Sequence, residues 1–218
     1  MFNPTPRQFK YIKAALFALA LLPALRLLVA GFAGQLGANP IEFITRSSGD
    51  WTLYFLCIAL AVTPLRRFSG WNWLVKLRRM LGLFAFFYAS LHFTTFLWFD
   101  HFFDLGEMFK DVVKRPFITV GFIAFVLLLP LALTSTNGMI RRLGGKRWQW
   151  LHRSVYAVAL LGILHFWWMR AGKHNFEKPI LFGTIVAGLL LVRVYFSWRN
   201  RSAGAAATQK RQVTPMPT

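Results

Sequence analysis

The segment Phe117–Leu133 reads FITVGFIAFVLLLPLAL, and none of its side chains carries a charge. A helix that crosses the hydrocarbon core of a bilayer needs about 20 mostly apolar residues, because no water is present there to bond its backbone N–H and C=O groups. A run of this length and composition is typical of a membrane span and untypical of a soluble domain. The segment therefore predicts an all-α integral membrane protein.

Five further segments have the same character, and Gly, Pro, Asn or charged residues separate them. The composition agrees, since 56% of the 218 residues are hydrophobic and only seven are acidic. We therefore expect a six-helix transmembrane bundle. Its spans are predicted at Ala14–Phe32, Trp51–Leu65, Met80–Phe99, Phe117–Leu133, Leu151–Met169 and Pro179–Trp198.

The distribution of charge predicts the orientation of the bundle. Most of the 26 basic residues fall before the first span, between the second and third, between the fourth and fifth, and after the sixth, so the positive-inside rule places both termini in the cytoplasm. All the acidic residues fall on the opposite side: Glu42, Asp50, Asp100, Asp104, Glu107, Asp111 and Glu177. We expect a cytoplasmic N-terminus over 1–13, a membrane domain over 14–198 and a disordered cytoplasmic tail over 199–218.

Several classes of function do not fit this sequence. The net charge of +19 follows the topology, and no soluble basic module is present for nucleic-acid binding. The single cysteine, Cys57, excludes an intramolecular disulfide, an iron–sulfur cluster held by several thiolates and a zinc knuckle. With one thiol available, any metal must be bound by nitrogen. No Gly-rich phosphate loop follows a strand, so the sequence contains no nicotinamide-binding domain of its own.

Three of the five histidines lie inside predicted spans, namely His92, His152 and His165. An ionisable side chain at membrane depth is costly, so each is a functional-site hypothesis, with a hydrogen bond between helices as the alternative. His92 and His165 lie on spans of the same direction, roughly 10 and 6 Å below their outer ends. Ala89 and Gly162, three residues before them, are small enough to leave room for a flat macrocycle. We predict that the pair binds one b-type haem from both faces.

His152 lies about 20 Å before His165 along the same helix, on the cytoplasmic side. We predict that it binds a second, inner haem, which would complete an electron path across the membrane. The positions that face it on the third span are Arg78 and Arg79, which do not normally bind iron. Together with Arg153 they are candidate contacts for haem propionates, and His152 itself has a propionate contact as its alternative role.

The remaining histidines and two arginines have predicted positions without a catalytic role. His101 and His174 fall in outer loops, where we expect imidazoles that are solvated or lie at the level of the lipid head groups. Arg26 is expected to face the interior of the bundle, and Arg193 to extend towards the cytoplasm.

The run Leu133–Tyr156, LTSTNGMIRRLGGKRWQWLHRSVY, followed by Leu164-His165-Phe166, resembles the ferric-reductase-like transmembrane domain. More narrowly, it resembles the haem-binding membrane subunits of the bacterial periplasmic methionine sulfoxide reductase system. The resemblance implies haem ligands at His92, His152 and His165. Members are also described as binding FMN, for which the sequence indicates no residues. The fourth intramembrane histidine and the fused flavin–nicotinamide domain of more distant relatives are absent here.

The resemblance further implies an inner-membrane, electron-transfer subunit without catalytic residues of its own. Such a subunit takes electrons from the quinone pool, or from a cytosolic flavin reductase, and passes them to a periplasmic molybdopterin-containing methionine sulfoxide reductase. Two alternatives remain. A ferric reductase or a cytochrome subunit for another periplasmic reductase would look much the same, and a transporter or scaffold without haem would use the histidines to line a path.

Overall fold

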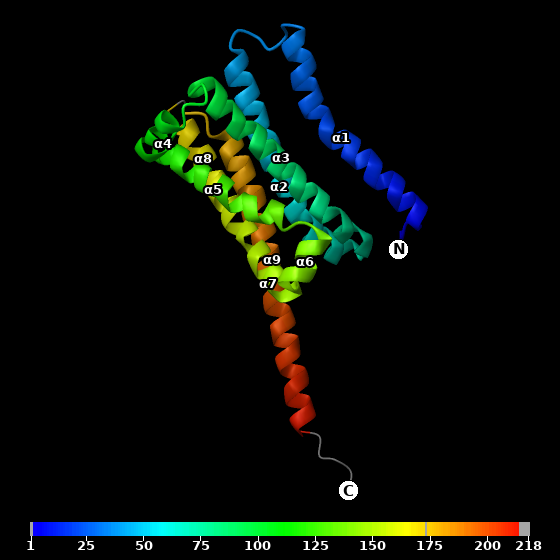
Figure 1. Cartoon of the computed structure of the whole chain (residues 1–218). Coiled ribbons are helices and arrows are strands. Elements are labelled where there is room, and N and C mark those ends of the chain that lie inside the picture. Colours follow the sequence, from blue (N-terminus) through cyan, green and yellow to red (C-terminus); the bar gives the residue numbers. More distant parts are fainter. Residues whose placement is uncertain (1, 173, 214–218) are drawn as a thin grey trace.

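The computed structural model describes residues 2–172 and 174–213, and those residues form helices joined by turns (Figure 1). Within these ranges, six helical stretches are long and apolar enough to cross a membrane, which confirms the predicted all-α, six-helix bundle. The elements in chain order are α1 (Pro6–Phe32), α2 (Pro40–Ser69), η1 (Asn72–Leu77), α3 (Arg78–Thr95), η2 (Phe96–Asp100), α4 (Leu105–Lys114), α5 (Pro116–Leu133), α6 (Asn137–Leu143), α7 (Gly145–Leu151), η3 (His152–Ser154), α8 (Val155–Ala171) and α9 (Glu177–Val213).

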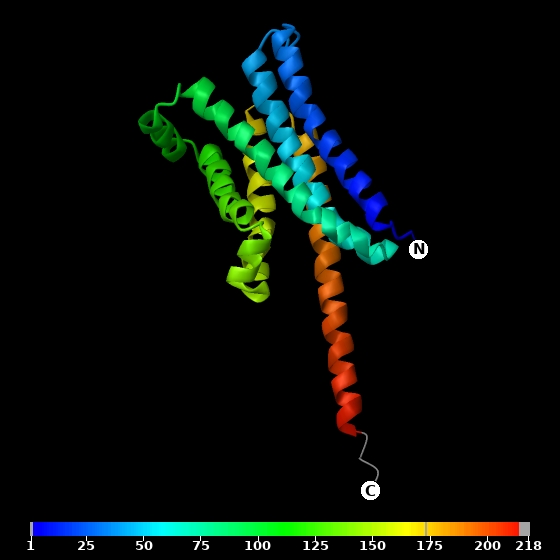
Figure 2. The same cartoon turned by 45° about the vertical axis from the view of Figure 1, so that its right-hand side comes forward.

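Successive long helices run through the bundle in alternating directions (Figure 1, Figure 2). We call the end formed by the last turn of α2, η1, α6 and α7 the basic end, because Arg66, Arg67, Arg141 and Arg142 lie there. The opposite end, formed by the first turns of α2, η2 and α4, is the acidic end. The sequence's acidic residues belong to this second end, as predicted.

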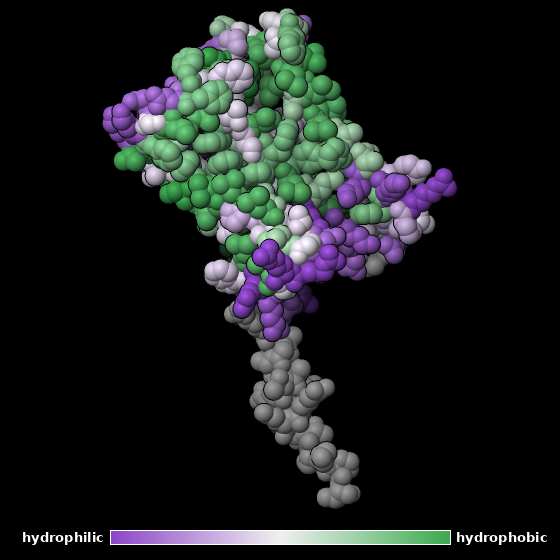
Figure 3. Space-filling view, viewed as in Figure 1, coloured by the Kyte–Doolittle hydropathy of each residue, from purple (hydrophilic) through white to green (hydrophobic). Residues whose placement is uncertain are grey.

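Two helix pairs, α2 with α3 and α5 with α8, make the most extensive contacts in the bundle. The buried core lies mainly between α2 and α3, where the rings of Phe55 and Tyr88 stack at 5.3 Å, and it continues to Ala159 on α8 and Val186 on α9. Hydrophobic side chains also cover the side of the bundle, as Figure 3 shows, while hydrophilic ones gather at the basic end and over α4. This outward apolar surface suits contact with lipid.

Helix α1 is attached to the bundle by the buried hydroxyl of Tyr88. That hydroxyl donates to the carbonyl of Ala20 at 2.7 Å and accepts from the N–H of Ala24 at 3.2 Å. In an uninterrupted helix the N–H of Ala24 would donate directly to the carbonyl of Ala20. Pro23 lies between them and disturbs the backbone hydrogen bonds of this turn. The side chain from α3 therefore bridges a distorted turn of α1.

Helix α2 begins earlier than the sequence indicated. The polar run at 47–50 reads as a break before a short span that starts at Trp51, whereas α2 starts at Pro40. The Ser48 hydroxyl donates to the backbone carbonyls of Ile44 and Thr45 in the preceding turn. The polar side chain is therefore satisfied within the helix, and the helix continues through it. This correction matters for function, because the added turns carry part of the site.

Three short helices and an extension were also missed. The loops expected after Phe99 and after Leu133 contain α4, α6 and α7. The predicted disordered tail over 199–218 is helical as far as Val213, and its residues 214–218 lie outside the described part of the chain. Its Ala-, Gln- and Lys-containing sequence favours a helix, and the first proline after Trp198 is Pro215.

Candidate functional site

His92 lies in the last turn of α3, close to the acidic end, and its ring packs against α2. The Nδ1 atom lies 2.9 Å from the carbonyl oxygen of Thr45. The ring rests on Gly49, one helical turn after Thr45, and a Cβ atom added to Gly49 would lie 3.2 Å from the ring carbon Cε1. A larger residue here would require the imidazole to shift by a few tenths of an ångström, so the glycine permits its close approach to the α2 backbone.

His165 on α8 is held against α5 in the same way. Its Nδ1 atom lies 2.7 Å from the carbonyl oxygen of Phe117, and its ring rests on Gly121, one turn later. A Cβ atom at Gly121 would lie only 2.7 Å from the same Nδ1. Each helix pair thus uses one arrangement: a carbonyl at position i and a glycine at i+4 on one helix hold an imidazole from the other.

These contacts define which ring nitrogens are available to a metal. A carbonyl oxygen only accepts hydrogen bonds, so Nδ1 of a neutral imidazole must carry the proton in both His92 and His165. The Nε2 atom of each ring then has a free lone pair. Metal-binding histidines commonly donate their other ring N–H to a backbone carbonyl, which orients the ring and increases its basicity.

The two imidazoles face each other between the helix pairs, with ring centroids 6.1 Å apart and planes inclined by 73°. One metal ion bound by both rings needs ligand nitrogens about 4 Å apart, since each metal–nitrogen bond is about 2 Å long. A centroid separation of 6.1 Å is compatible with that spacing. A structural or catalytic zinc ion usually takes three or four protein ligands, whereas a haem brings its own equatorial ligands and needs only axial ones. The pair therefore fits a haem iron better than a bare metal ion.

The small residues expected to leave room for a macrocycle have packing roles in this structure. Ala89 is buried in the core. Gly162 faces α2, where an added Cβ would lie 3.4 Å from the side chain of Leu53. The glycines in contact with the imidazoles are instead Gly49 and Gly121, on the neighbouring helices.

His152 lies apart from this pair, on η3 at the basic end, and the structure brings no second histidine to it among the described residues. Its ring stacks on Trp148 with centroids 3.8 Å apart, and its Nδ1 bonds to the carbonyl of the same residue at 3.0 Å. Nε2 lies 3.4 Å from the hydroxyl of Ser135. Both ring nitrogens therefore have partners, and the backbone of Leu131 also interacts with the ring.

The three arginines predicted near an inner haem differ in their surroundings. Arg78 and Arg79 interact electrostatically with the His152 imidazole, so the structure gathers these three residues at the basic end. Arg79 also donates to the side-chain oxygen of Asn137 at 2.6 Å. Arg153 is exposed.

Two of the peripheral predictions were wrong. His101 is largely buried, with its ring edge-on to Phe96 and its Nε2 3.4 Å from Asp111, whereas we expected an imidazole that is solvated or at the level of the lipid head groups. The unexpected helix α4 brings Asp111 over this turn and covers the ring. Arg26 is exposed on α1, which lies at the edge of the bundle (Figure 2). His174 is exposed, as expected.

Comparison with known proteins identifies the family. The family described as "Ferric reductase like transmembrane component" matches residues 48–163, more than half of the chain. A protein from Herminiimonas arsenicoxydans, named protein-methionine-sulfoxide reductase heme-binding subunit MsrQ, is 73% identical over 94% of both chains. Proteins with the same name from Ralstonia nicotianae and Azospira oryzae are 56% and 53% identical, over 93% and 94% of this chain and 93% and 90% of theirs. The chain belongs to the MsrQ family.

Membership of the MsrQ family confirms the resemblance predicted from Leu133–Tyr156, and with the six apolar helices it makes the chain a multi-pass membrane protein. The ferric-reductase-like match contains His92, His152 and both glycines of the site, and it ends just before His165.

The backbone supports of the pair in this MsrQ family member were missed by sequence reasoning. Thr45 and Gly49 lie in a part of α2 that was read as a loop, and Phe117 and Gly121 were read only as span residues. Gly121, inside the predicted span Phe117–Leu133, was a usable signal, since a helix-interior glycine commonly marks a close approach of another group. Gly49 gave no such signal, because it lies before the predicted start of its span at Trp51.

Proposed function

We propose that this MsrQ family member is the haem-binding membrane subunit of a periplasmic methionine sulfoxide reductase system, and that it carries electrons across the bacterial inner membrane. The observation that carries the proposal is the facing pair of His92 and His165, each with Nδ1 on a backbone carbonyl and Nε2 free. The names of the similar proteins support the same function, since each is named as the heme-binding subunit of a protein-methionine-sulfoxide reductase.

In this proposal the His92 and His165 imidazoles would hold the iron of an outer b-type haem. A haem held there would supply one-electron oxidation and reduction. The protein's own contribution is orientation: the Thr45 and Phe117 carbonyls hold each ring and retain its Nδ1 proton, and the glycines at 49 and 121 permit the close approach. Backbone groups of rigid helices make precise supports for such a site.

His152 is the proposed ligand of a second, inner haem at the basic end. The proximity of Arg78 and Arg79 supports this assignment, because guanidinium groups bind carboxylates such as haem propionates strongly. His152 would exchange its weak contact with Ser135 for the iron. Arg153 is a further proposed propionate contact.

The charge distribution supports the proposed direction of transfer. With the basic end in the cytoplasm, both termini are cytoplasmic and the His92–His165 pair lies near the periplasmic surface. Electrons would enter from the quinone pool, or from a cytosolic flavin reductase, and leave to a molybdopterin-containing reductase that docks at the acidic end. The carboxylates Glu107 and Asp111 of α4 pair with Lys110 and Arg115, and together these charged side chains give that end a polar surface for a soluble partner.

Spectroscopy of the purified full-length protein tests the haem assignment. We expect a Soret band, a reduced α-band and protohaem extractable in a pyridine hemochrome assay. His92→Ala and His165→Ala should each remove the same spectral component, because one iron loses either axial ligand. His174→Ala, at an exposed histidine near the acidic end, is the matched control and should keep it. Colourless protein from haem-replete cells would contradict the proposal.

Sealed vesicles of known orientation test the direction independently of the ligands. A quinol analogue should produce the reduced spectrum. A sulfoxide reductase added at the acidic end together with methionine sulfoxide, which accepts the electrons, should restore the oxidised one. High salt should slow the second step if charge contributes to docking, since exposed charges are screened over about 10 Å at 0.1 M ionic strength. Reoxidation only by acceptors confined to the basic end would mean that the direction is reversed.

A further inference from the structure

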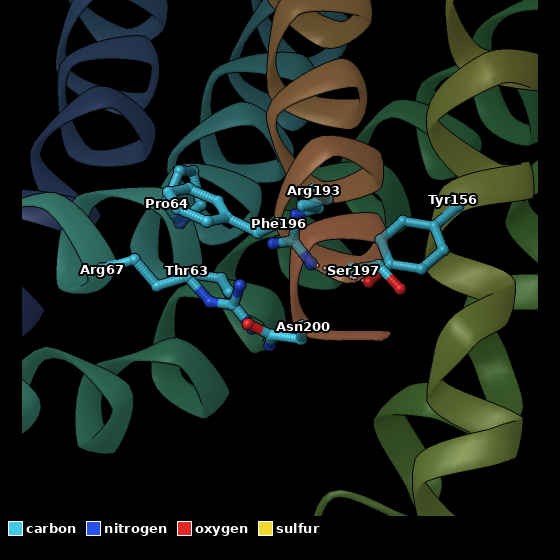
Figure 4. A pocket seen from close by; sticks show the side chains of 8 residues that line it. All are labelled: Thr63, Pro64, Arg67, Tyr156, Arg193, Phe196, Ser197 and Asn200. Carbon is cyan, nitrogen blue, oxygen red and sulfur yellow. Dashed lines mark hydrogen bonds between the residues drawn. The ribbon is translucent and has the colours of Figure 1, made fainter. Parts of the chain in front are cut away.

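A pocket of about 400 Å³ opens at the basic end between α2, α8 and α9, far along the bundle from the His92–His165 pair (Figure 4). Thr63 and Arg67 line it from α2, Tyr156 from α8, and Arg193 and Asn200 from α9. The α2 and α9 residues lie near the ends of apolar spans that finish at Ser69 and Asn200. The pocket is therefore at the depth where a bilayer's hydrocarbon core meets its head groups.

The guanidinium of Arg193 is fixed in this pocket and keeps unused donors. It donates to the hydroxyl of Tyr156 at 2.7 Å and to the backbone carbonyl of Leu60 at 2.6 Å. Its Nε–H is buried and has no hydrogen-bond partner among the described residues. A buried donor without an acceptor is unfavourable, and an arginine has five N–H groups in a planar fork. The guanidinium of Arg193 is thus held in place by two hydrogen bonds, while its Nε–H lacks an acceptor among the described residues.

The positive charge of the pocket also lacks a counter-charge. Arg67 lies over the ring of Phe196, with 4.8 Å from its guanidinium carbon to the ring centroid, and Arg78 interacts electrostatically with Arg193. No carboxylate is among the lining residues that the structure describes, and the sequence's acidic residues belong to the other end. An anion with several acceptor oxygens suits such a site, and arginine pairs with phosphate through parallel hydrogen bonds.

The surface beside the pocket is apolar. Phe68 on α2 is 70% exposed, and its ring lies 5.3 Å from that of Phe196, which lines the pocket and contacts Arg67. A free phosphate would use only the charged groups, whereas a phospholipid would place its phosphate on the arginines and its acyl chains on these rings. Basic pockets between membrane helices on the cytoplasmic side are typical binding sites for anionic lipid head groups.

We propose that this pocket binds the phosphate diester of an anionic phospholipid, with Arg67 and Arg193 as the phosphate-binding residues and the Phe68–Phe196 surface against the acyl chains. Binding would give the Arg193 guanidinium an anionic partner and would join the ends of α2, α8 and α9. The inference does not depend on the presence of haem.

Native mass spectrometry of the full chain in detergent, with equimolar phosphatidylglycerol and phosphatidylcholine, tests this proposal. We expect preferential retention of phosphatidylglycerol and a loss of about tenfold in that retention for Arg67→Gln, since one charged phosphate contact contributes roughly a factor of ten in affinity. Arg142→Gln is the matched control, because Arg142 is also exposed at the basic end but lies outside the pocket. Arg193→Gln should lose retention too, but it also breaks the contacts to Tyr156 and Leu60, so the decisive variant is Arg67→Gln.

Each result has a definite reading. Preferential retention that Arg67→Gln removes and Arg142→Gln leaves intact supports the site. Equal retention of both lipids overturns it, and an equal effect of the two variants overturns it by revealing unspecific attraction to the basic end. Displacement of phosphatidylglycerol by millimolar inorganic phosphate identifies a free-phosphate site and also overturns the lipid assignment.

Discussion

Replacing Gly121 with alanine tests the support of the outer haem site most directly. The new Cβ would lie 2.7 Å from Nδ1 and 2.9 Å from Cε1 of His165, whereas ordinary van der Waals contacts begin at 3.4 Å. The ring must therefore move by about 0.7 Å, from 2.7 to 3.4 Å, or α5 and α8 must separate. Either movement disturbs the hydrogen bond between Nδ1 and the Phe117 carbonyl and the position of Nε2.

The magnitude can be worked against a control glycine. Gly82 lies within α3, and a Cβ added there meets nothing within 4 Å, so Gly82→Ala should stabilise by about 1 kcal/mol through helix propensity alone. Gly121→Ala has the same propensity gain. Overpacking costs about 1–3 kcal/mol and the disturbed hydrogen bond about 1 kcal/mol. Gly121→Ala should thus be about 2–4 kcal/mol less stable than the control.

Haem content per protein, the electron paramagnetic resonance of the ferric form and unfolding in denaturing detergent are the measurements. We expect Gly121→Ala to lose haem or to show a changed axial-ligand signal, because His165 can no longer present Nε2 in its original position. Gly82→Ala should keep both the content and the signal. Equal haem content, spectra and stability in the two variants would refute the reasoning that α5 holds the His165 ring.

Two further predictions concern contacts between helices. Tyr88→Phe should destabilise the protein by about 1 kcal/mol in detergent unfolding, because the hydroxyl that bridges Ala20 and Ala24 is lost. The loss stays small because the two backbone groups can partly re-pair. Unchanged stability would mean that α1 is held by packing alone. Asp50 on α2 and Lys178 on α9 form an ion pair at the acidic end. A double-mutant cycle of unfolding free energies with Asp50→Asn and Lys178→Met should give a coupling of about 0.2–1 kcal/mol that falls with salt. Zero coupling at low salt would show that the pair contributes nothing to joining α2 and α9.

Much of the architecture was predictable because lipid imposes a simple constraint. Each span must satisfy its own backbone and present apolar side chains, so runs such as Phe117–Leu133 identify helices without any tertiary information. Where the local pattern was mixed, prediction was wrong. The polar residues before Trp51 are compatible with a loop or a helix, and only their bonds to the preceding turn select the helix.

The sequence by itself determined the six spans, the separation of charge between the two ends, the family resemblance and the three intramembrane histidines. These features depend on composition, period and spacing along one chain. The tertiary structure decided which groups hold those histidines. Helix pairing brings Gly49 and the Thr45 carbonyl to His92, and it brings Gly121 and the Phe117 carbonyl to His165. The two carbonyl contacts join residues that are 47 and 48 positions apart in the sequence. Such contacts depend on the rotation and distance of neighbouring helices, which no local pattern encodes.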